Sequence, residues 1–149
     1  MFRGTFDHAI DAKGRTSFPA KFRDVLAASG DLRLVVTRSP FDDEPCLHVF
    51  PWKAWEEVEA KIAGLPRFDA NAVRLRRLYV AGAHECDLDP QGRLLVPGTL
   101  REFAGLARDV RWAAAGHMIE LWSSERWATA TAMSPAEQVE FRRAVAERL

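Results

Sequence analysis

The chain has 149 residues and a mass of 16.8 kDa, enough for one domain of ordinary size. Basic and acidic residues number 21 each, so the formal net charge is zero, which excludes a protein that coats nucleic acid by bulk charge. A composition of 48% hydrophobic and 28% charged residues also excludes intrinsic disorder and collagen-like repeats.

The first fifty residues predict strands interrupted by one helix. Residues 5–10 alternate as a strand does and lead into a turn at residues 11–14, which begins with Asp and ends with Gly. Residues 15–18 predict a second strand that closes a hairpin, and Pro19 precedes a short amphipathic helix. Two further strands are predicted at residues 32–37 and 46–50, with a loop insertion over residues 39–45.

The middle of the chain predicts helices, and the remainder returns to strands. A tryptophan-containing amphipathic helix is expected over residues 52–65, and Asp69 is expected to cap another. Ser134 and Glu137 form a capping box that opens a last helix with a thin apolar stripe. The other predicted elements are strands near 84–88 and 93–96, a helix near 98–105, and strands near 109–115 and 118–122.

One motif occurs twice. Asp11-x-x-Gly14-Arg15 recurs as Asp89-x-x-Gly92-Arg93, and seven of the 23 positions aligned between residues 11–33 and 89–111 are identical. Chance would give about one or two identities on average residue usage. The chain is therefore interpreted as a tandem duplication with an α+β fold, built from two β-hairpin/helix repeats in one pseudo-symmetric unit.

The expected domain organisation follows from this duplication. It comprises a first repeat at 5–54, connecting helices at 55–82, a second repeat at 83–126 and a helical tail at 127–149.

At these residues the sequence resembles the MraZ family of bacterial transcriptional regulators. The likeness covers both motifs, the N-terminal Met-Phe-Arg-Gly, residues 50–55 and residues 77–83. It implies two AbrB-like (SpoVT/AbrB) repeats of the swapped-hairpin type, whose hairpins interleave, and assembly of the protein into homo-oligomeric rings. It also implies binding to directly repeated DNA elements ahead of the division and cell-wall gene cluster. Residues beyond about 131 carry no role transferred from the family.

The charge of the two repeats differs, and this difference selects a candidate DNA-binding face. Residues 1–38 carry seven basic and four acidic residues, whereas residues 83–131 carry five and seven. Only the first repeat is therefore expected to contact phosphates and bases. The candidates are Arg3, Lys13, Arg15, Lys21 and Arg23. For each of them except Arg15, a solvated surface charge is an equally good interpretation.

The motif residues also have a structural interpretation. Asp11 and Asp89 are expected to cap the amides of their turns and to pair with Arg15 and Arg93, respectively. Arg93 is expected to serve the shared core or a subunit interface. The motif residues assigned a structural role are Asp11, Gly14, Asp89, Gly92 and Arg93.

Other function classes are less well supported. The four histidines are scattered and belong to no recognised nucleophile or zincin motif, so no catalytic residue, cofactor or metal is assigned. Cys46 and Cys86 are too few and too far apart for a disulfide scaffold or a zinc site. No apolar run approaches the ~20 residues that span a bilayer, so a cytoplasmic protein is expected.

The preferred interpretation is a sequence-specific regulator of transcription, acting as a repressor on double-stranded DNA in the cytoplasm, in association with the nucleoid. No membrane or small-molecule partner is expected. The alternative is an AbrB-like antitoxin or another protein-partner-binding module. Antitoxins usually pair one such domain with a disordered tail, whereas this chain ends in a short capped helix.

Overall fold

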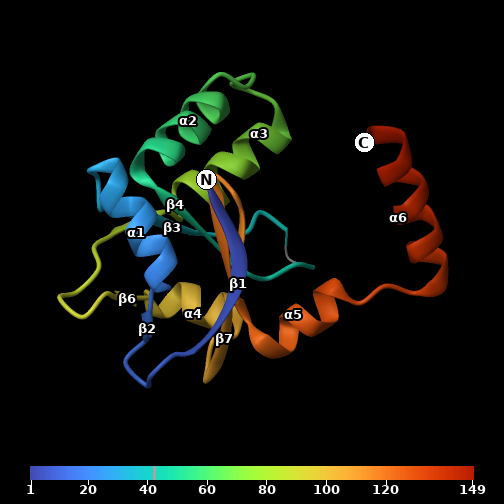
Figure 1. The fold of residues 1–149 in the computed structure, drawn as a ribbon. Coiled ribbons are helices and arrows are strands. Elements are labelled where there is room, and N and C mark those ends of the chain that lie inside the picture. The colour runs from blue at the N-terminus through green and yellow to red at the C-terminus, as the bar shows by residue number, and fades with distance from the viewer. Residues whose placement is uncertain (42) are drawn as a thin grey trace.

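The computed structural model describes residues 1–41 and 43–149, and its elements alternate between short strands and helices (Figure 1). The first half of the chain contains, in order, β1 (Phe2–Ala9), β2 (Arg15–Ser17), α1 (Ala20–Ser29), β3 (Leu34–Arg38), β4 (Leu47–Pro51), α2 (Trp52–Ala63), α3 (Ala70–Leu75) and the π-helical turn η1 (Arg76–Val80). The second half contains β5 (His84–Cys86), β6 (Arg93–Leu95), α4 (Gly98–Ala104), β7 (Asp109–Gly116), β8 (Met118–Ser123), α5 (Ser124–Thr131) and α6 (Pro135–Arg148). The predicted α+β class and the order of strands and helices are confirmed.

The main sheet of the described residues is antiparallel and has the strand order β1-β7-β8-β4-β3-β5. β1 of the first copy pairs along its whole length with β7 of the second, and β5 of the second copy pairs with β3 of the first. β4 and β8 meet at the centre. The two copies therefore exchange strands, and neither holds a complete sheet of its own.

The local hairpin that the sequence predicts is not continuous in the first copy, where its two strands pair only next to the turn. A single bridge joins Ile10 to Thr16, and beyond it β2 pairs with β6 of the other copy to make a separate two-stranded ribbon. The prediction of a continuous local hairpin was wrong because alternation shows which face of a strand is buried but not which strand lies beside it. The expected loop over residues 39–45 joins β3 to β4, and its Asp42 lies outside the described residues.

The largest hydrophobic core is shared between the copies. Phe18 and Phe22 come from the first copy, and the Phe18 ring meets Trp112 of the second copy edge-on, with the ring centroids 5.3 Å apart. Leu94 and Leu100 of the second copy are buried in the same cluster. Burial of this apolar surface, the dominant stabilising contribution in folding, requires both repeats at once.

A smaller cluster covers the opposite face of the sheet, where α2, α3 and η1 pack. Val35 points to this face while its neighbours Leu34 and Val36 point to the main core, as strand alternation requires. Trp55, on the inner face of the amphipathic helix α2, is buried here against Phe50 and Tyr79.

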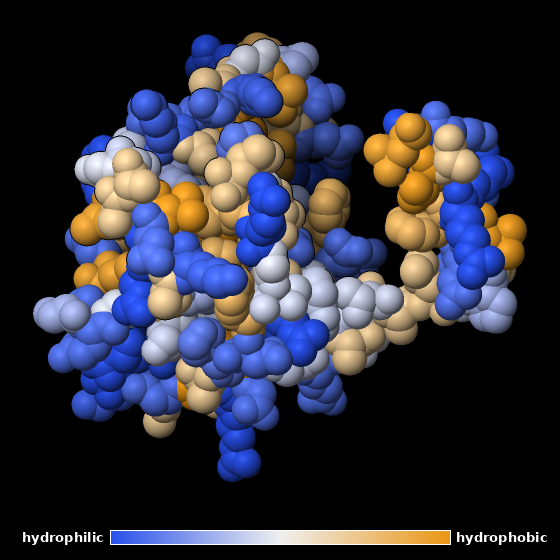
Figure 2. Space-filling model, viewed as in Figure 1, coloured by the Kyte–Doolittle hydropathy of each residue, from blue (hydrophilic) through white to orange (hydrophobic). Residues whose placement is uncertain are grey.

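The last helix, α6, stands apart from the rest of the molecule (Figure 1). Its predicted capping box is confirmed: the Glu137 backbone donates to Ser134 Oγ at 3.2 Å, and the Ser134 backbone donates to Glu137 Oε1 at 3.1 Å. None of its residues is buried, and Figure 2 shows it as a separate column with apolar and polar side chains exposed. No helix of the described residues combines the length and the apolar character needed to cross a membrane.

Candidate nucleic-acid interface

The first motif folds into a turn held by one carboxylate. Asp11 Oδ1 accepts hydrogen bonds from the backbone N–H groups of Lys13 (3.0 Å) and Arg15 (2.9 Å), and Asp11 Oδ2 accepts the Nε–H of Arg15 at 2.7 Å. Gly14 closes the turn with φ 90°, a conformation that a side chain disfavours. The backbone hydrogen bond from Arg15, followed by its side-chain hydrogen bond, lowers the pKa of Asp11 to about 2, so this carboxylate is ionised at neutral pH.

The second motif repeats this geometry. Asp89 accepts the backbone N–H groups of Gln91 and Arg93 at 2.9 Å each and the Nε–H of Arg93 at 2.7 Å. The backbone hydrogen bond from Arg93 is the largest cause that lowers the pKa of Asp89. The predicted pairing of Asp with Arg across each turn is thus present in both copies.

The two turns meet in the β2–β6 ribbon. Arg15 lies opposite Leu95 and Ser17 lies opposite Arg93, while Thr16 and Leu94, between them, are buried. Since side chains alternate between the faces of a strand, both arginines share the outer face of the ribbon. Their side chains are 35% and 33% exposed, so the two sites are presented equally to solvent.

Backbone hydrogen bonds fasten each turn to the other copy. The Val96 N–H donates to the Gly14 carbonyl at 2.8 Å, and the Phe18 N–H donates to the Gly92 carbonyl at 3.0 Å. In each turn the Asp carboxylate accepts only the Nε–H of the motif arginine. The terminal Nη groups of Arg15 have no acceptor within residues 1–41 and 43–149. A guanidinium held in this way can present two donors to the O6 and N7 atoms of guanine.

Two helix arginines each bind the turn of the other copy, and we call this arrangement the crosswise lock. Arg23 of α1 donates through Nη1 to the Gln91 carbonyl at 3.3 Å, and Arg101 of α4 donates through Nη1 to the Ala12 carbonyl at 3.5 Å. Each guanidinium passes so close to the glycine of the opposite turn that a Cβ there would collide with it. The sequence did not predict the contact of Arg101 with the first turn.

This crosswise lock predicts unequal costs for two glycine substitutions. Gly92 and Gly30 have nearly the same φ, 76° and 78°, but a Cβ at Gly92 meets Arg23 whereas one at Gly30 meets nothing within 4 Å. We expect Gly30→Ala to cost ~1 kcal/mol of unfolding free energy from backbone strain alone. Gly92→Ala should cost ~1 kcal/mol more, because the guanidinium of Arg23 must also move and gives up its hydrogen bond to the Gln91 carbonyl. Urea unfolding of both variants measures the difference in unfolding free energy. Equal losses would show that the Arg23 side chain moves aside without cost.

The five predicted DNA-binding residues do not all lie together. Lys13 and Arg15 lie at the first turn, and Lys21 is exposed in the first turn of α1, shortly after β2 ends. Arg3 lies at the opposite end of β1, six residues before Ala9 and therefore about 20 Å along the strand. Arg23 is close to the ribbon, but its guanidinium already binds the second turn.

The surroundings of the two turns differ in charge. A groove beside the second turn is lined by Asp24, Asp87 and Asp89, with Arg23 as its basic residue. The first turn carries Lys13, where the second carries Gln91. Negative charge in that groove disfavours phosphate, so the first turn is the better candidate for DNA contact.

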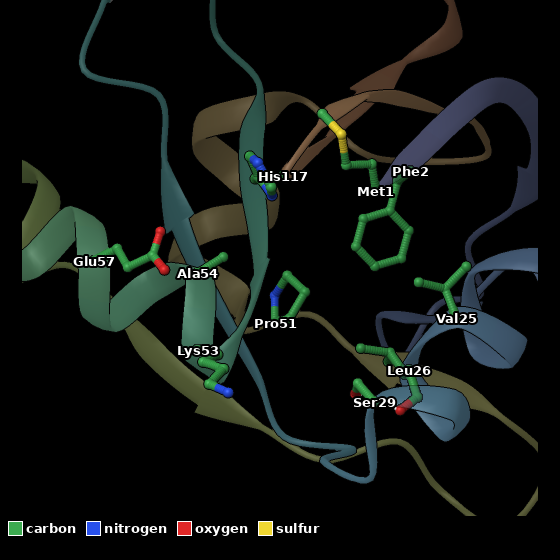
Figure 3. A pocket seen from close by; sticks show the side chains of 10 residues that line it. All are labelled: Met1, Phe2, Val25, Leu26, Ser29, Pro51, Lys53, Ala54, Glu57 and His117. Atoms are coloured by element: carbon green, nitrogen blue, oxygen red, sulfur yellow. Dashed lines mark hydrogen bonds between the residues drawn. The ribbon is translucent and has the colours of Figure 1, made fainter.

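A separate hollow of about 220 Å³ lies where the N-terminus passes α1 and α2 (Figure 3). Phe2, Leu26 and Pro51 gather around it, and the other lining residues are Met1, Val25, Ser29, Lys53, Ala54, Glu57 and His117. These side chains form no nucleophile–base pair, and the volume lies below the range of about 300–1,000 Å³ that is common for ligand sites. The residues that line this hollow therefore supply no candidate catalytic pair.

Comparison with known proteins adds an independent observation. The chain matches the family described as "MraZ protein, putative antitoxin-like" twice, over residues 1–78 and 79–148. It is similar to a protein of Anaeromyxobacter sp. (strain Fw109-5) named "Transcriptional regulator MraZ", with 44% identity over 140 residues, which are 93% of this chain and 95% of that protein. A protein of the same name from Methylobacillus flagellatus is 44% identical over 142 residues, 95% of this chain and 94% of the relative.

Proposed function

Because the chain belongs to the MraZ family, whose named relatives are transcriptional regulators, we propose that it regulates transcription by binding DNA through the β2–β6 ribbon. The observation that carries this proposal is the outer face of the ribbon, where Asp11 fixes Arg15 by its Nε and leaves the Nη groups for an acceptor. A two-stranded ribbon fits the major groove of B-DNA. The exposed Leu95 on the same face suits contact with a thymine methyl group.

Within this proposal, Arg15 reads bases, while Lys13 and Lys21 contact phosphates beside it. Arg23 acts indirectly, since its hydrogen bond to the Gln91 carbonyl holds the second turn against α1. Arg3 lies too far along β1 to reach the same base pairs and is assigned to a flanking phosphate. The assignment includes no catalytic step and no cofactor.

Assembly follows from the small size of this basic face. A neutral chain that neutralises only a few phosphates binds DNA weakly and in a salt-sensitive manner. Joining several copies raises the effective concentration of each later contact, and affinity can rise ~10²–10⁴-fold. The protein is therefore proposed to act as a homo-oligomer. The resemblance to the MraZ family further implies a ring on directly repeated DNA elements ahead of the division and cell-wall gene cluster, which the protein is proposed to repress at the nucleoid.

Mobility-shift titration on DNA from upstream of its own gene tests this function. Cooperative binding is expected to direct repeats about one helical turn apart, with affinity falling steeply as salt increases. Light scattering on the same sample should give an oligomer. A monomer that binds a single isolated site tightly would contradict the proposed assembly, and an absence of any sequence preference would contradict the function.

A protein-binding role is the second candidate, and the exposed helix α6 favours it. Val139 and Phe141 are 66% and 55% exposed on a helix that has no buried residue. If this role were the main one, a protein cut after residue 133 would bind DNA normally but fail to regulate its promoter in cells. If DNA binding suffices, the shortened protein should regulate as the full chain does.

A further inference from the structure

Three side chains of the kinds that bind metals meet on the sheet at the junction between the two copies. Cys46 and His48 come from the first copy, and Glu120 comes from the second. One ligand atom from each, the thiol sulfur, an imidazole nitrogen and a carboxylate oxygen, lie within 4.8 Å of one another. This cluster belongs neither to the ribbon nor to the hollow of Figure 3.

The strand register explains why these residues meet. Cys46 directly precedes β4, and His48 follows two residues later, so both side chains point to the same face. In the β4–β8 pair, His48 lies directly opposite Glu120. Directly opposed side chains on one face of an antiparallel pair have Cβ atoms about 4.5–5.5 Å apart. A ligand set divided between two copies and two strands leaves no local spacing motif in the sequence.

Neighbouring side chains orient two of the three groups. The Tyr79 hydroxyl lies 2.5 Å from His48 Nδ1, which leaves His48 Nε2 toward Glu120. The Trp122 Nε1–H donates to Glu120 Oε1 at 3.2 Å, which leaves Oε2 for another partner. Outer partners of this kind, which fix the orientation of a histidine and a carboxylate, are a regular feature of metal sites.

Two of the three distances between the ligand atoms are close to those around a tetrahedral ion. Glu120 Oε2 lies 3.8 Å from Cys46 Sγ and 3.8 Å from His48 Nε2. Bond lengths of about 2.3 Å to sulfur and about 2.0–2.2 Å to nitrogen and oxygen place ligand atoms of a tetrahedral zinc site about 3.3–3.6 Å apart. The ligand atoms of Cys46 and His48 lie no more than 4.8 Å apart, so the site closes when these side chains move toward each other, with a water in the fourth position.

We propose that Cys46, His48 and Glu120 bind a zinc ion that fastens the first copy to the second at the β4–β8 junction. The combination of thiolate and imidazole favours Zn²⁺ over Mg²⁺ or Ca²⁺, which prefer oxygen ligands. The side chain of Glu120 is 26% exposed, so the ion enters from its side, while Cys46 is buried. Binding displaces the proton of the Cys46 thiol, which leaves as H⁺ to the buffer.

The imidazole and the thiol of the cluster differ in the proton that they carry. Burial lowers the pKa of His48 to about 4, so the imidazole is neutral at pH 7, which is the form that binds a metal. Burial and the Glu120 carboxylate raise the pKa of the Cys46 thiol, so an ion must displace a firmly held proton, which costs part of its binding energy.

The proposal is tested by titrating the untagged protein with Co²⁺. This ion occupies tetrahedral zinc sites and, unlike Zn²⁺, absorbs visible light there. One equivalent should produce a thiolate-to-cobalt absorption band, and Zn²⁺ should abolish it. Saturation at about 100 times Kd should raise the melting temperature by about 5–10 °C. Glu120→Gln, which keeps the shape of the side chain and the acceptor for Trp122, should weaken binding more than tenfold.

The second cysteine provides a matched control. Cys86→Ser should bind Co²⁺ as the wild type does, whereas Cys46→Ser should lose the absorption band. If Cys46→Ser fails to fold, the Co²⁺ affinities of Glu120→Gln and Tyr79→Phe test the proposal instead. Tyr79→Phe removes the partner of His48 Nδ1 and should lower the affinity 10–100-fold. A wild-type protein without the band, or a band that survives Glu120→Gln unchanged, would overturn the proposal and leave a buried hydrogen-bonded cluster only.

Discussion

Replacing Arg15 by Ala is expected to abolish specific DNA binding while leaving the fold intact. The fold should survive because Arg15 is partly exposed and its ion pair with Asp11 lies at the surface, where such pairs contribute little stability. Binding should fall because a bidentate arginine–guanine contact discriminates by ~1–3 kcal/mol, which is about 5–150-fold in affinity. In an oligomer bound to several repeats, this loss is multiplied over the subunits.

Arg93→Ala is the matched comparison, because Arg93 has the same turn, the same carboxylate contact and the same exposure. The sequence suggested that Arg93 serves the shared core or a subunit interface. Its place on the outer face of the ribbon argues instead for a position near the same DNA groove. We expect a smaller loss of binding than for Arg15→Ala, because acidic side chains line the groove beside the second turn and Gln91 replaces Lys13.

Mobility-shift titrations of both variants measure this difference in DNA affinity. Size-exclusion profiles and melting curves are the controls for assembly and folding. Lys13→Ala should weaken binding to specific and non-specific DNA alike and reduce the salt dependence, as expected of a phosphate contact. Equal losses for Arg15→Ala and Arg93→Ala, with both proteins assembled, would show that the two copies contact DNA equally. If Arg15→Ala bound specific DNA as tightly as the wild type, the proposal that the β2–β6 ribbon contacts DNA through Arg15 would be wrong.

Separating the two copies should abolish folding of either half as a monomer. Residues 1–82 contain β1 and β2, whose partners β7 and β6 lie in residues 83–149. Phe18 would also lose its contact with Trp112. With unpaired strand edges and an uncovered core, each fragment lacks the apolar burial that outweighs the entropy of folding. Far-UV circular dichroism and thermal melts of each fragment should show no cooperative transition at low concentration.

A fragment of residues 1–133 is the control for this experiment. It lacks only α6 and the residues beside it, in which no side chain is buried, so its melting temperature should match that of the full chain. Folding of residues 1–82 only at high concentration would agree with the strand exchange, because a second copy of the fragment can replace the missing strands. A folded monomer of residues 1–82 would contradict the shared core.

Most of the local structure could be predicted from the sequence. The two Asp-x-x-Gly-Arg turns, the helices after Pro19 and Pro97, and the Ser134 capping box appear where the pattern placed them. These features depend on residues within four positions of one another, so the information that specifies them is contiguous. The family resemblance rests on the same contiguous motifs, and the matches at residues 1–78 and 79–148 agree with it.

The candidate site was predictable only in part. The sequence identified Arg15 by its motif and by the charge of its repeat, and both signals are local. It did not identify the contacts of Arg23 and Arg101 with the opposite turns, because each joins residues 68 or 89 positions apart. The separation of Arg3 from the other basic residues also depends on the extended course of β1.

The sequence by itself therefore determined the duplication, the order of strands and helices, and the turn chemistry that holds each motif arginine. Only the tertiary structure decided that β1 pairs with β7, that Arg15 and Arg93 share one ribbon, and that Cys46 and His48 meet Glu120. The physical reason is that backbone hydrogen bonds between strands carry no residue identity. Two copies with the same alternation offer each strand equivalent partners, and the choice is made by burial of the shared core around Phe18 and Trp112.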